Sequence, residues 1–171
     1  MKIKDLMHAS TVESCTIDTK LHNVAKIMKE TNRGALAVVD KNNKVIGIVT
    51  DRDVCLTLAT TKDKKISELV VKDAIHKLKV YTINSEDSVT TALSEMRQNK
   101  VGRLPVTDKD GKLKGVISIS DLLAHVIDEK EGVGHLFLNE ENLATTIKSL
   151  FERNNKKIVK KEHKEFEFSE V

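Results

Sequence analysis

The sequence predicts an α/β fold made of two pseudo-symmetric repeats, followed by a C-terminal amphipathic helix. Two observations lead to this prediction. The chain aligns with itself at one constant offset, which places Met28 on Met96, and both copies show the same order of strand and helix patterns. The composition, 39% hydrophobic and 32% charged residues in a chain of 171, is that of a globular protein. One repeat alone buries little apolar surface, so the two copies are expected to share a core.

The internal repeat runs without a gap through its most similar part. Nine of the 26 positions from 28 to 53 are identical to their counterparts at this repeat offset, in the segment from 96 to 121. The identical pairs are Met28 and Met96, Gly34 and Gly102, Leu36 and Leu104, Val38 and Val106, Asp40 and Asp108, Lys41 and Lys109, Lys44 and Lys112, Gly47 and Gly115, and Asp53 and Asp121. This similarity indicates a duplication, because unrelated segments share far fewer identities.

Each copy is expected to begin with a short strand and a helix. The strands are predicted at Ser14–Ile17 and Val80–Ile83. The helices follow where apolar residues recur at helical spacing, at Leu21, Val24, Ala25 and Met28 in one copy and at Val89, Ala92, Leu93 and Met96 in the other. Residues able to cap these helices are Asp18 or Thr19 in the first copy and Ser85 or Asp87 in the second.

A β-hairpin and a second helix complete each copy. The hairpin strands are predicted at Ala35–Val39 and Val45–Thr50, and at Leu104–Val106 and Leu113–Ser118, with polar turns between them. A short helix is expected to start near Asp53 in the first copy and near Asp121 in the second.

These patterns divide the chain into three parts. Residues 1–60 form the first repeat, 66–128 the second repeat and 129–171 a C-terminal extension. The polar stretch Thr60–Lys65 is expected to link the repeats, and the charged segment Val71–Lys79 shows no clear counterpart in the first copy.

The extension contains one amphipathic pattern. Leu143, Ile147, Leu150 and Phe151 recur at helical spacing, which predicts a helix near 140–152 with Asn139 as a candidate cap. An apolar stripe must be buried. Three places stay open for it: its own repeats, a dimer interface or a client protein.

Both hairpins end in a hydroxyl residue followed three positions later by aspartate. The segments are Gly47-Ile48-Val49-Thr50-Asp51-Arg52-Asp53 and Gly115-Val116-Ile117-Ser118-Ile119-Ser120-Asp121. At a helix N-terminus, such a pair can bind a phosphate through the hydroxyl and a ribose through the carboxylate. The same spacing is also that of a capping box, which needs no ligand, and spacing alone favours this interpretation.

With the duplication, these segments resemble a tandem pair of CBS (cystathionine β-synthase) domains, also called a Bateman module. The resemblance covers residues 1 to about 128. It includes Ile3-Lys4-Asp5-Leu6-Met7, with a looser echo at Ile66-Ser67-Glu68-Leu69-Val70, and the segments Gly34-Ala35-Leu36-Ala37-Val38-Val39-Asp40 and Val101-Gly102-Arg103-Leu104-Pro105-Val106-Thr107-Asp108. It implies a non-catalytic regulatory module that binds an adenosine-containing ligand, namely AMP, ADP, ATP or S-adenosylmethionine, between the repeats and requires no cofactor.

The resemblance also implies the binding residues. They are Thr50 and Asp53 for one site and Ser118 and Asp121 for the other, with adenine walls from Thr16, Ile17, Ala35 and Leu36, and from Thr82, Ile83, Arg103 and Leu104. Ala37 stands where the second repeat has Pro105, which is expected to loosen the loop beside one pocket. Arg33, Arg52 and Arg103 are expected at the cleft rims as phosphate partners or as surface residues, with Arg52 favoured. Because position 120 is serine, the two sites are expected to differ in phosphate affinity.

Other function classes find little support. No apolar run approaches the roughly 18–20 residues that span a bilayer, and the net charge of +3 with 3% aromatics disfavours nucleic-acid binding. The six histidines show no metal-ligand spacing. Cys15 and Cys55 are interpreted as buried thiols in a reducing cytoplasm. The sequence therefore predicts a cytoplasmic regulatory protein, a homodimer with a client protein. The alternative is a ligand-free interaction scaffold in which both motifs are only helix caps.

Overall fold

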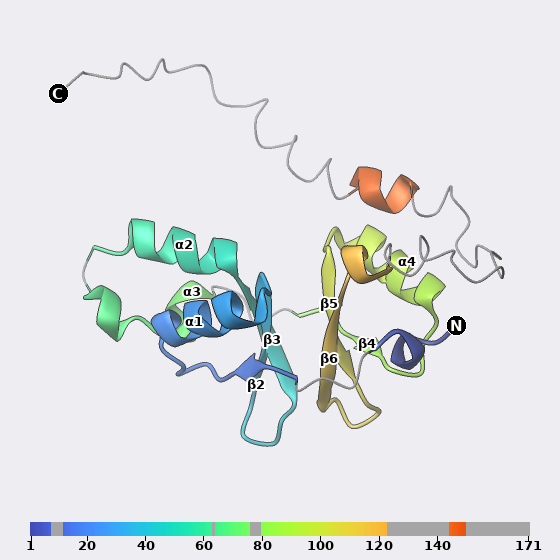
Figure 1. Ribbon diagram of the computed structural model, residues 1–171, viewed down its shortest axis with the longest axis horizontal. Helices are drawn as coiled ribbons and strands as arrows, with labels where there is room; N and C mark the ends of the chain where they lie inside the picture. The colour runs from blue at the N-terminus through green and yellow to red at the C-terminus, as the bar shows by residue number, and fades with distance from the viewer. Residues whose placement is uncertain (8–11, 63, 76–79, 123–143, 150–171) are drawn as a thin grey trace, which may run out of the picture.

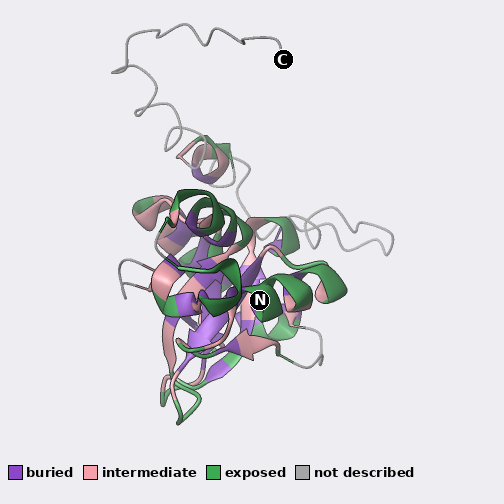
Figure 2. Cartoon of the chain, turned by 90° about the vertical axis from the view of Figure 1, so that its left-hand side faces the viewer, coloured by how far each residue is buried: buried purple, intermediate pink, exposed green. Residues whose placement is uncertain are grey.

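A computed structural model describes residues 1–7, 12–62, 64–75, 80–122 and 144–149. The fold is α/β, as predicted, with two three-stranded sheets in the strand orders β1-β2-β3 and β4-β5-β6. The two sheets lie side by side in the middle of the molecule, and helices cover their outer sides (Figure 1). The strands are mostly buried, and the exposed residues lie on the outer sides of the helices and in the hairpin turns (Figure 2).

The first half consists of the first sheet and two helices. Its elements are β1 (Ser14–Cys15), α1 (Leu21–Thr31), β2 (Ala35–Val39), β3 (Val45–Thr50) and α2 (Asp51–Thr60). Strand β2 is central, parallel to β1 and antiparallel to β3. Ala37 lies in the middle of β2, fully buried and paired with both neighbours, so the prediction that it loosens a loop is wrong.

The second half repeats this arrangement. Its elements are β4 (Ile83–Asn84), α4 (Val89–Asn99), β5 (Arg103–Thr107) and β6 (Leu113–Ser118), and residues 119–122 are helical. The strand registers agree at the repeat offset: Ala35 pairs with Thr50, and Arg103 pairs with Ser118. The hairpins are thus where the sequence predicted them, whereas β1 and β4 are two residues each, shorter than expected.

Short helices lead into the halves: η1 (Ile3–Leu6), η2 (Ile66–Glu68) and α3 (Val71–Ala74). The N-terminal segment packs on the second half, and the segment between the two halves packs on the first half. Ile3 N donates to the carbonyl of Asp87 in the second half (2.9 Å), and Val71 N donates to the carbonyl of Thr19 in the first (2.9 Å). In Figure 1 the N-terminus accordingly lies beside α4, and α3 lies beside α1.

This exchange corrects two sequence predictions. The donors Ile3 and Val71 are counterparts at the repeat offset, and so are the acceptors Thr19 and Asp87. The counterpart of Ile3-Lys4-Asp5-Leu6-Met7 is therefore Val71-Lys72-Asp73-Ala74-Ile75 rather than Ile66-Ser67-Glu68-Leu69-Val70. The start of Val71–Lys79 does have a counterpart in the first copy, and residues 76–79 lie outside the described residues.

The sheets meet around a pseudo-two-fold axis. The buried residues Ala37, Val39 and Leu113 form a cluster between them. At the hairpin turns Lys44 pairs with Lys112, flanked by hydrogen bonds from Val45 N to the carbonyl of Gly111 (3.2 Å) and from Leu113 N to the carbonyl of Asn43 (3.0 Å). The two bonds are counterparts of each other at the repeat offset. The hairpins thus share a core, as the duplication predicted.

The N-caps of α1 and α4 differ from the predicted residues. The N-cap of α1 is Lys20, whose ammonium group has no acceptor for a helix N–H; the Thr19 hydroxyl instead accepts from Thr16 N (2.9 Å). The N-cap of α4 is Ser88, whose hydroxyl accepts from Thr91 N (3.0 Å). The predicted caps lie before each helix, in the turns that bind the exchanged segments.

Candidate functional site

The first corner, where β3 runs into α2, is built by Thr50 and Asp53. The Thr50 backbone N and hydroxyl both donate to Asp53 Oδ2, at 2.9 and 2.6 Å, and Asp53 N donates back to the Thr50 hydroxyl at 3.3 Å. Both residues are half-buried. This is a complete capping box, which satisfies backbone groups at the start of the helix.

The second corner, at the end of β6, has the same geometry. The Ser118 N and hydroxyl donate to Asp121 Oδ2 at 2.8 and 2.7 Å, and Asp121 N donates to the Ser118 hydroxyl at 3.2 Å. Ser118 is half-buried and Asp121 exposed. Each box uses the Oδ2 atom of its carboxylate, so capping and ligand binding are chemically compatible roles for one aspartate.

Gly34 connects the first corner to the second half. Its carbonyl accepts a hydrogen bond from Asp51 N (3.2 Å), which places Gly34 against the start of α2. A Cβ at Gly34 would lie 3.0 Å from Asp51 Oδ2 and 3.1 Å from Arg103 Nη2. Because Gly34 has no side chain, Asp51 of the same repeat and Arg103 of the opposite repeat can both approach its backbone.

The residues expected to wall the adenine differ in accessibility. Leu36 belongs to the core of the first half, and Ile83 and Leu104 belong to the core of the second, all three with at most 3% of their surface exposed. Because their side chains fill these cores, these residues could contact a bound adenine only through their backbone atoms. Ala35 is buried on the face of β2 that also bears Ala37 and meets the other sheet.

The remaining candidates lie at the surface. Ile17 is half-buried against the core of the first half. The exposed candidates are Thr16, Thr82, Arg33, Arg52 and Arg103. Arg103 is the one for which the structure shows an approach to the first corner, whereas the sequence favoured Arg52.

The structure also contains an apolar groove that sequence reasoning missed. It has a volume of about 530 Å³, and its lining residues are Ala25, Met28, Asp51, Val54, Cys55, Leu58 and Ala59, from α1 and α2. Leu56 and Leu58 of α2 are exposed, at 49% and 37%. The signal in the sequence is that apolar residues continue around α2 beyond the face that packs on its sheet, which indicates a second contact surface.

The two cysteines lie in different environments. Cys15 is buried, and burial raises the pKa of its thiol to about 11. Cys55 is exposed at the apolar groove, so the prediction that it is buried is wrong. The prediction rested on the apolar character of cysteine, and α2 turns this position away from the core.

Part of the predicted C-terminal helix is described, and it contacts its own chain. Residues 144–149 are helical and lie beside α4 (Figure 1). Arg97 Nη1 of α4 donates to the Thr145 hydroxyl (3.4 Å), and Thr146 is buried. Ile147 is half-buried, whereas Leu143, Leu150 and Phe151 of the predicted stripe lie outside the described residues.

Two classes of feature are absent from the described part of the chain. Its His, Cys, Asp and Glu residues form no group of three or more placed to hold a metal ion. None of the helices among these residues combines the length and apolarity needed to cross a membrane.

The chain was compared with known proteins. The CBS domain family matches residues 3–60 and 66–128. The protein YlbB of Bacillus subtilis (strain 168) is 37% identical over 133 residues, which is 77% of this chain and 86% of YlbB.

Two solved structures share the fold. The CBS domain pair of protein MJ0100, in complex with 5′-methylthioadenosine and S-adenosyl-L-methionine, has a TM-score of 0.63 at 20% identity over 73% of this chain and 94% of that one. CBSX2 in complex with AMP has a TM-score of 0.62 at 22% identity over 76% and 98%. The chain belongs to the CBS domain family, as a tandem pair of CBS domains.

Proposed function

We propose that this protein is a regulatory module that senses an adenosine-containing ligand, namely AMP, ADP, ATP or S-adenosylmethionine, between its two repeats. The observation that supports this most is the pair of matched corners. Each repeat places a hydroxyl and a carboxylate 2.6 or 2.7 Å apart at the junction of strand and helix. In a ligand complex, the Thr50 and Ser118 hydroxyls would turn their hydrogens from the carboxylates to the phosphate, and Asp53 and Asp121 would accept from ribose hydroxyls.

The geometry suits such a ligand for two physical reasons. The first-turn N–H groups of a helix carry partial positive charge, which attracts phosphate. The box also fixes each aspartate before a ligand arrives, so little side-chain entropy is lost on binding. The AMP complex of CBSX2 and the S-adenosyl-L-methionine complex of the MJ0100 domain pair support this ligand class.

The sensing module would act on other molecules rather than catalyse a reaction. We propose a homodimer in the cytoplasm that regulates a client protein, without a required cofactor and without nucleic-acid or membrane binding. The apolar groove between α1 and α2 supports a protein partner, because an exposed apolar surface of this kind commonly marks an interface.

A specific observation favours a second function, that of a ligand-free interaction scaffold. Both motifs form complete capping boxes without any ligand, so their residue types already have a structural explanation. In this case the adenosine compounds would not bind, and the exposed apolar groove would be the functional surface.

Thermal unfolding with and without ligand separates the two functions. A ligand that binds only the native state stabilises it by about 2.7 kcal/mol at 100 times its dissociation constant. The sensing function predicts a concentration-dependent rise of the melting temperature with at least one of the four adenosine compounds. Guanosine monophosphate serves as the control for a general nucleotide effect. No shift with any of the four compounds at millimolar concentration would favour the scaffold.

The Asp53→Asn variant then distinguishes a ribose ligand from a cap. Asparagine keeps a side-chain oxygen that can accept from Thr50 N at the N3 position of the capping box, so the stability of the unliganded protein should change by less than about 0.5 kcal/mol. A ribose that donates to the carboxylate makes charge-assisted bonds, so the affinity should fall about tenfold or more. Asp121→Asn tests the second corner in the same way.

A further inference from the structure

The two corners share one backbone geometry but differ in the charges around it. Around the first corner, Arg33 precedes Gly34, and Asp51 and Arg52 follow Thr50; all three are exposed. Their counterparts at the repeat offset are Val101, Ile119 and Ser120, none of which carries a charge.

The opposite repeat increases this difference. Arg103 of β5 reaches the first corner, because its Nη2 atom lies 3.1 Å from the Cβ position of Gly34. The residue related to Arg103 by the internal repeat is Ala35, a buried methyl group on β2. At the position equivalent to Arg103, the first repeat therefore offers the second corner a methyl group in place of a guanidinium.

Three positions of the second half that are charged in the first half are uncharged instead. Tyr81, Val101 and Ile119 are half-buried and pack against the core of the second half. Their counterparts in the first copy are Glu13, Arg33 and Asp51, all charged. The change that matters for a phosphate is the loss of cations: valine stands in place of Arg33 and serine in place of Arg52, so these two positions offer a bound phosphate no countercharge.

We infer that the two corners sort adenosine compounds by the charge of the 5′ group. The first corner takes a 5′-phosphorylated adenosine, with Arg103 and Arg52 neutralising the phosphate above the Thr50 hydroxyl. The second corner takes an adenosine compound that has no phosphate. This inference rests on the proposed function, because it assigns the ligand class at each of its two sites.

Calorimetry of the full chain with two probes, AMP and 5′-methylthioadenosine, tests the sorting. Arg103→Gln removes one exposed charge without altering either capping box. It should weaken AMP binding by about tenfold, which is the loss expected for one charge-assisted contact. Arg52→Gln should weaken AMP binding similarly and leave 5′-methylthioadenosine binding unchanged, because Arg52 belongs to the first corner alone. Asp53→Asn should weaken AMP binding, and Asp121→Asn should weaken 5′-methylthioadenosine binding.

Two further measurements make the test sharper. Lys41→Gln removes an exposed lysine from the hairpin turn and is the control for net charge; it should leave both affinities unchanged. Raising the salt concentration should weaken AMP binding through screening of the arginines and leave the uncharged probe unaffected. Ser120→Arg, which copies Arg52 into the second corner, should bring AMP to that corner as a second binding event.

Three results would count against the sorting. The first is that Arg103→Gln binds AMP as tightly as the parent does. The second is that Asp53→Asn weakens the binding of both probes equally. The third is that AMP binding is weakened by Asp121→Asn and not by Asp53→Asn. If neither probe gave a heat of binding with the parent protein, the result would instead refute adenosine binding itself. Melting curves that match the parent confirm that each variant is folded.

Discussion

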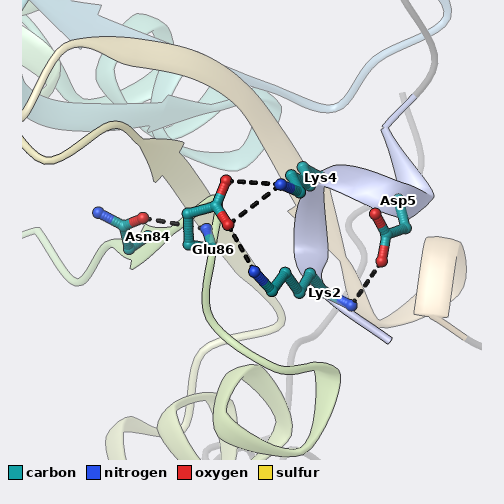
Figure 3. A network of polar contacts seen from close by, with 5 residues as sticks. All are labelled: Lys2, Lys4, Asp5, Asn84 and Glu86. Carbon is teal, nitrogen blue, oxygen red and sulfur yellow. Dashed lines mark hydrogen bonds and ion pairs between the residues drawn. The ribbon is translucent and has the colours of Figure 1, made fainter.

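The two halves bind their exchanged segments with the same backbone and with different side chains. In the second half, Glu86 pairs with Lys2 (2.7 Å) and Lys4 (2.9 Å) of the N-terminal segment, as Figure 3 shows. In the first half, Lys20 Nζ donates to the Glu68 carbonyl of the exchanged segment (3.2 Å), and Asp73 of this segment pairs with Lys64 of the same connection (2.6 Å). The duplicated fold thus keeps the main-chain hydrogen bonds and leaves the surface charges free to change.

The same division separates the cores from the corners. Most positions of the two cores are equivalent at the repeat offset, whereas the groups around Thr50 and Ser118 differ in charge. Packing restricts a buried side chain in size and shape, but a surface side chain meets few such restrictions. We therefore expect paired substitutions to have equal effects in the cores and unequal effects wherever the surfaces differ.

The largest effect should come from the centres of the two cores. Leu36 and Leu104 are equivalent, at 1% and 0% exposed. Leu36→Ala and Leu104→Ala should each lower the free energy of unfolding by about 2–5 kcal/mol, since each leaves a cavity. Urea unfolding should give similar losses and a single transition, because the halves share the cluster between the sheets. A nearly neutral effect for one of them would contradict the equivalence of the cores.

A methionine pair should show where the equivalence of the halves ends. Met96 is fully buried, whereas its counterpart Met28 is 7% exposed and lines the apolar groove. Met96→Ala leaves a closed cavity and should cost about 2–5 kcal/mol. Met28→Ala opens onto an existing groove and should cost less. Equal losses in urea unfolding would mean that the groove is closed in solution, for example by a second copy of the chain.

A smaller effect should reveal the exchange of segments. Ile3 is fully buried in the core of the second half, although it opens the first sequence repeat. Ile3→Val should cost about 0.5–1.5 kcal/mol. Hydrogen exchange should show the loss of protection in β4 and α4 rather than in β1 and α1. The matched change Val71→Ala should give the reverse pattern, since Val71 lies in the core of the first half.

The features predicted correctly from the sequence are those fixed by short-range patterns. Hairpins, helices and their register follow from alternation, helical spacing and the constant repeat offset, all of which are visible in the sequence without knowledge of distant contacts. The partners Thr50 and Asp53 were also predictable, because a capping box joins residues three positions apart. For the same reason, spacing alone could not decide between a cap and a ligand site.

The features that the sequence did not reveal depend on contacts between distant residues. The exchange of Ile3 and Val71 arises from packing between halves, and no local pattern records which core a segment enters. The approach of Arg103 to Gly34 likewise requires the two sheets to be placed face to face. The caps of α1 and α4 were misplaced because Thr19 and Asp87 accept local hydrogen bonds from Thr16 N and Asn84 N, which fix the turns and not the helix starts.

The smallest effect concerns the ion pairs of the N-terminal segment. Hydrogen bonds from Lys2 and then Lys4 lower the pKa of Glu86 to about 2, and the pKa of Lys2 is raised in return. Because the pKa of Glu86 is lower in the folded state, its contribution to stability is present above the ordinary glutamate value. It is lost as the pH falls toward about 2. All three side chains are about half exposed, so the contribution is small and screened by salt.

Glu86→Gln removes this titration while keeping a side chain of the same size. Urea unfolding between pH 6 and pH 2 should show that the difference in stability between parent and variant shrinks as the pH falls. High salt should reduce the difference at pH 6. Glu30→Gln is the matched control, because Glu30 pairs with Lys26 within α1, at 3.9 Å, and holds no exchanged segment. If the difference for Glu86→Gln were independent of pH, the Glu86 carboxylate would not hold the segment, and the backbone bonds of Ile3 and Lys4 would suffice.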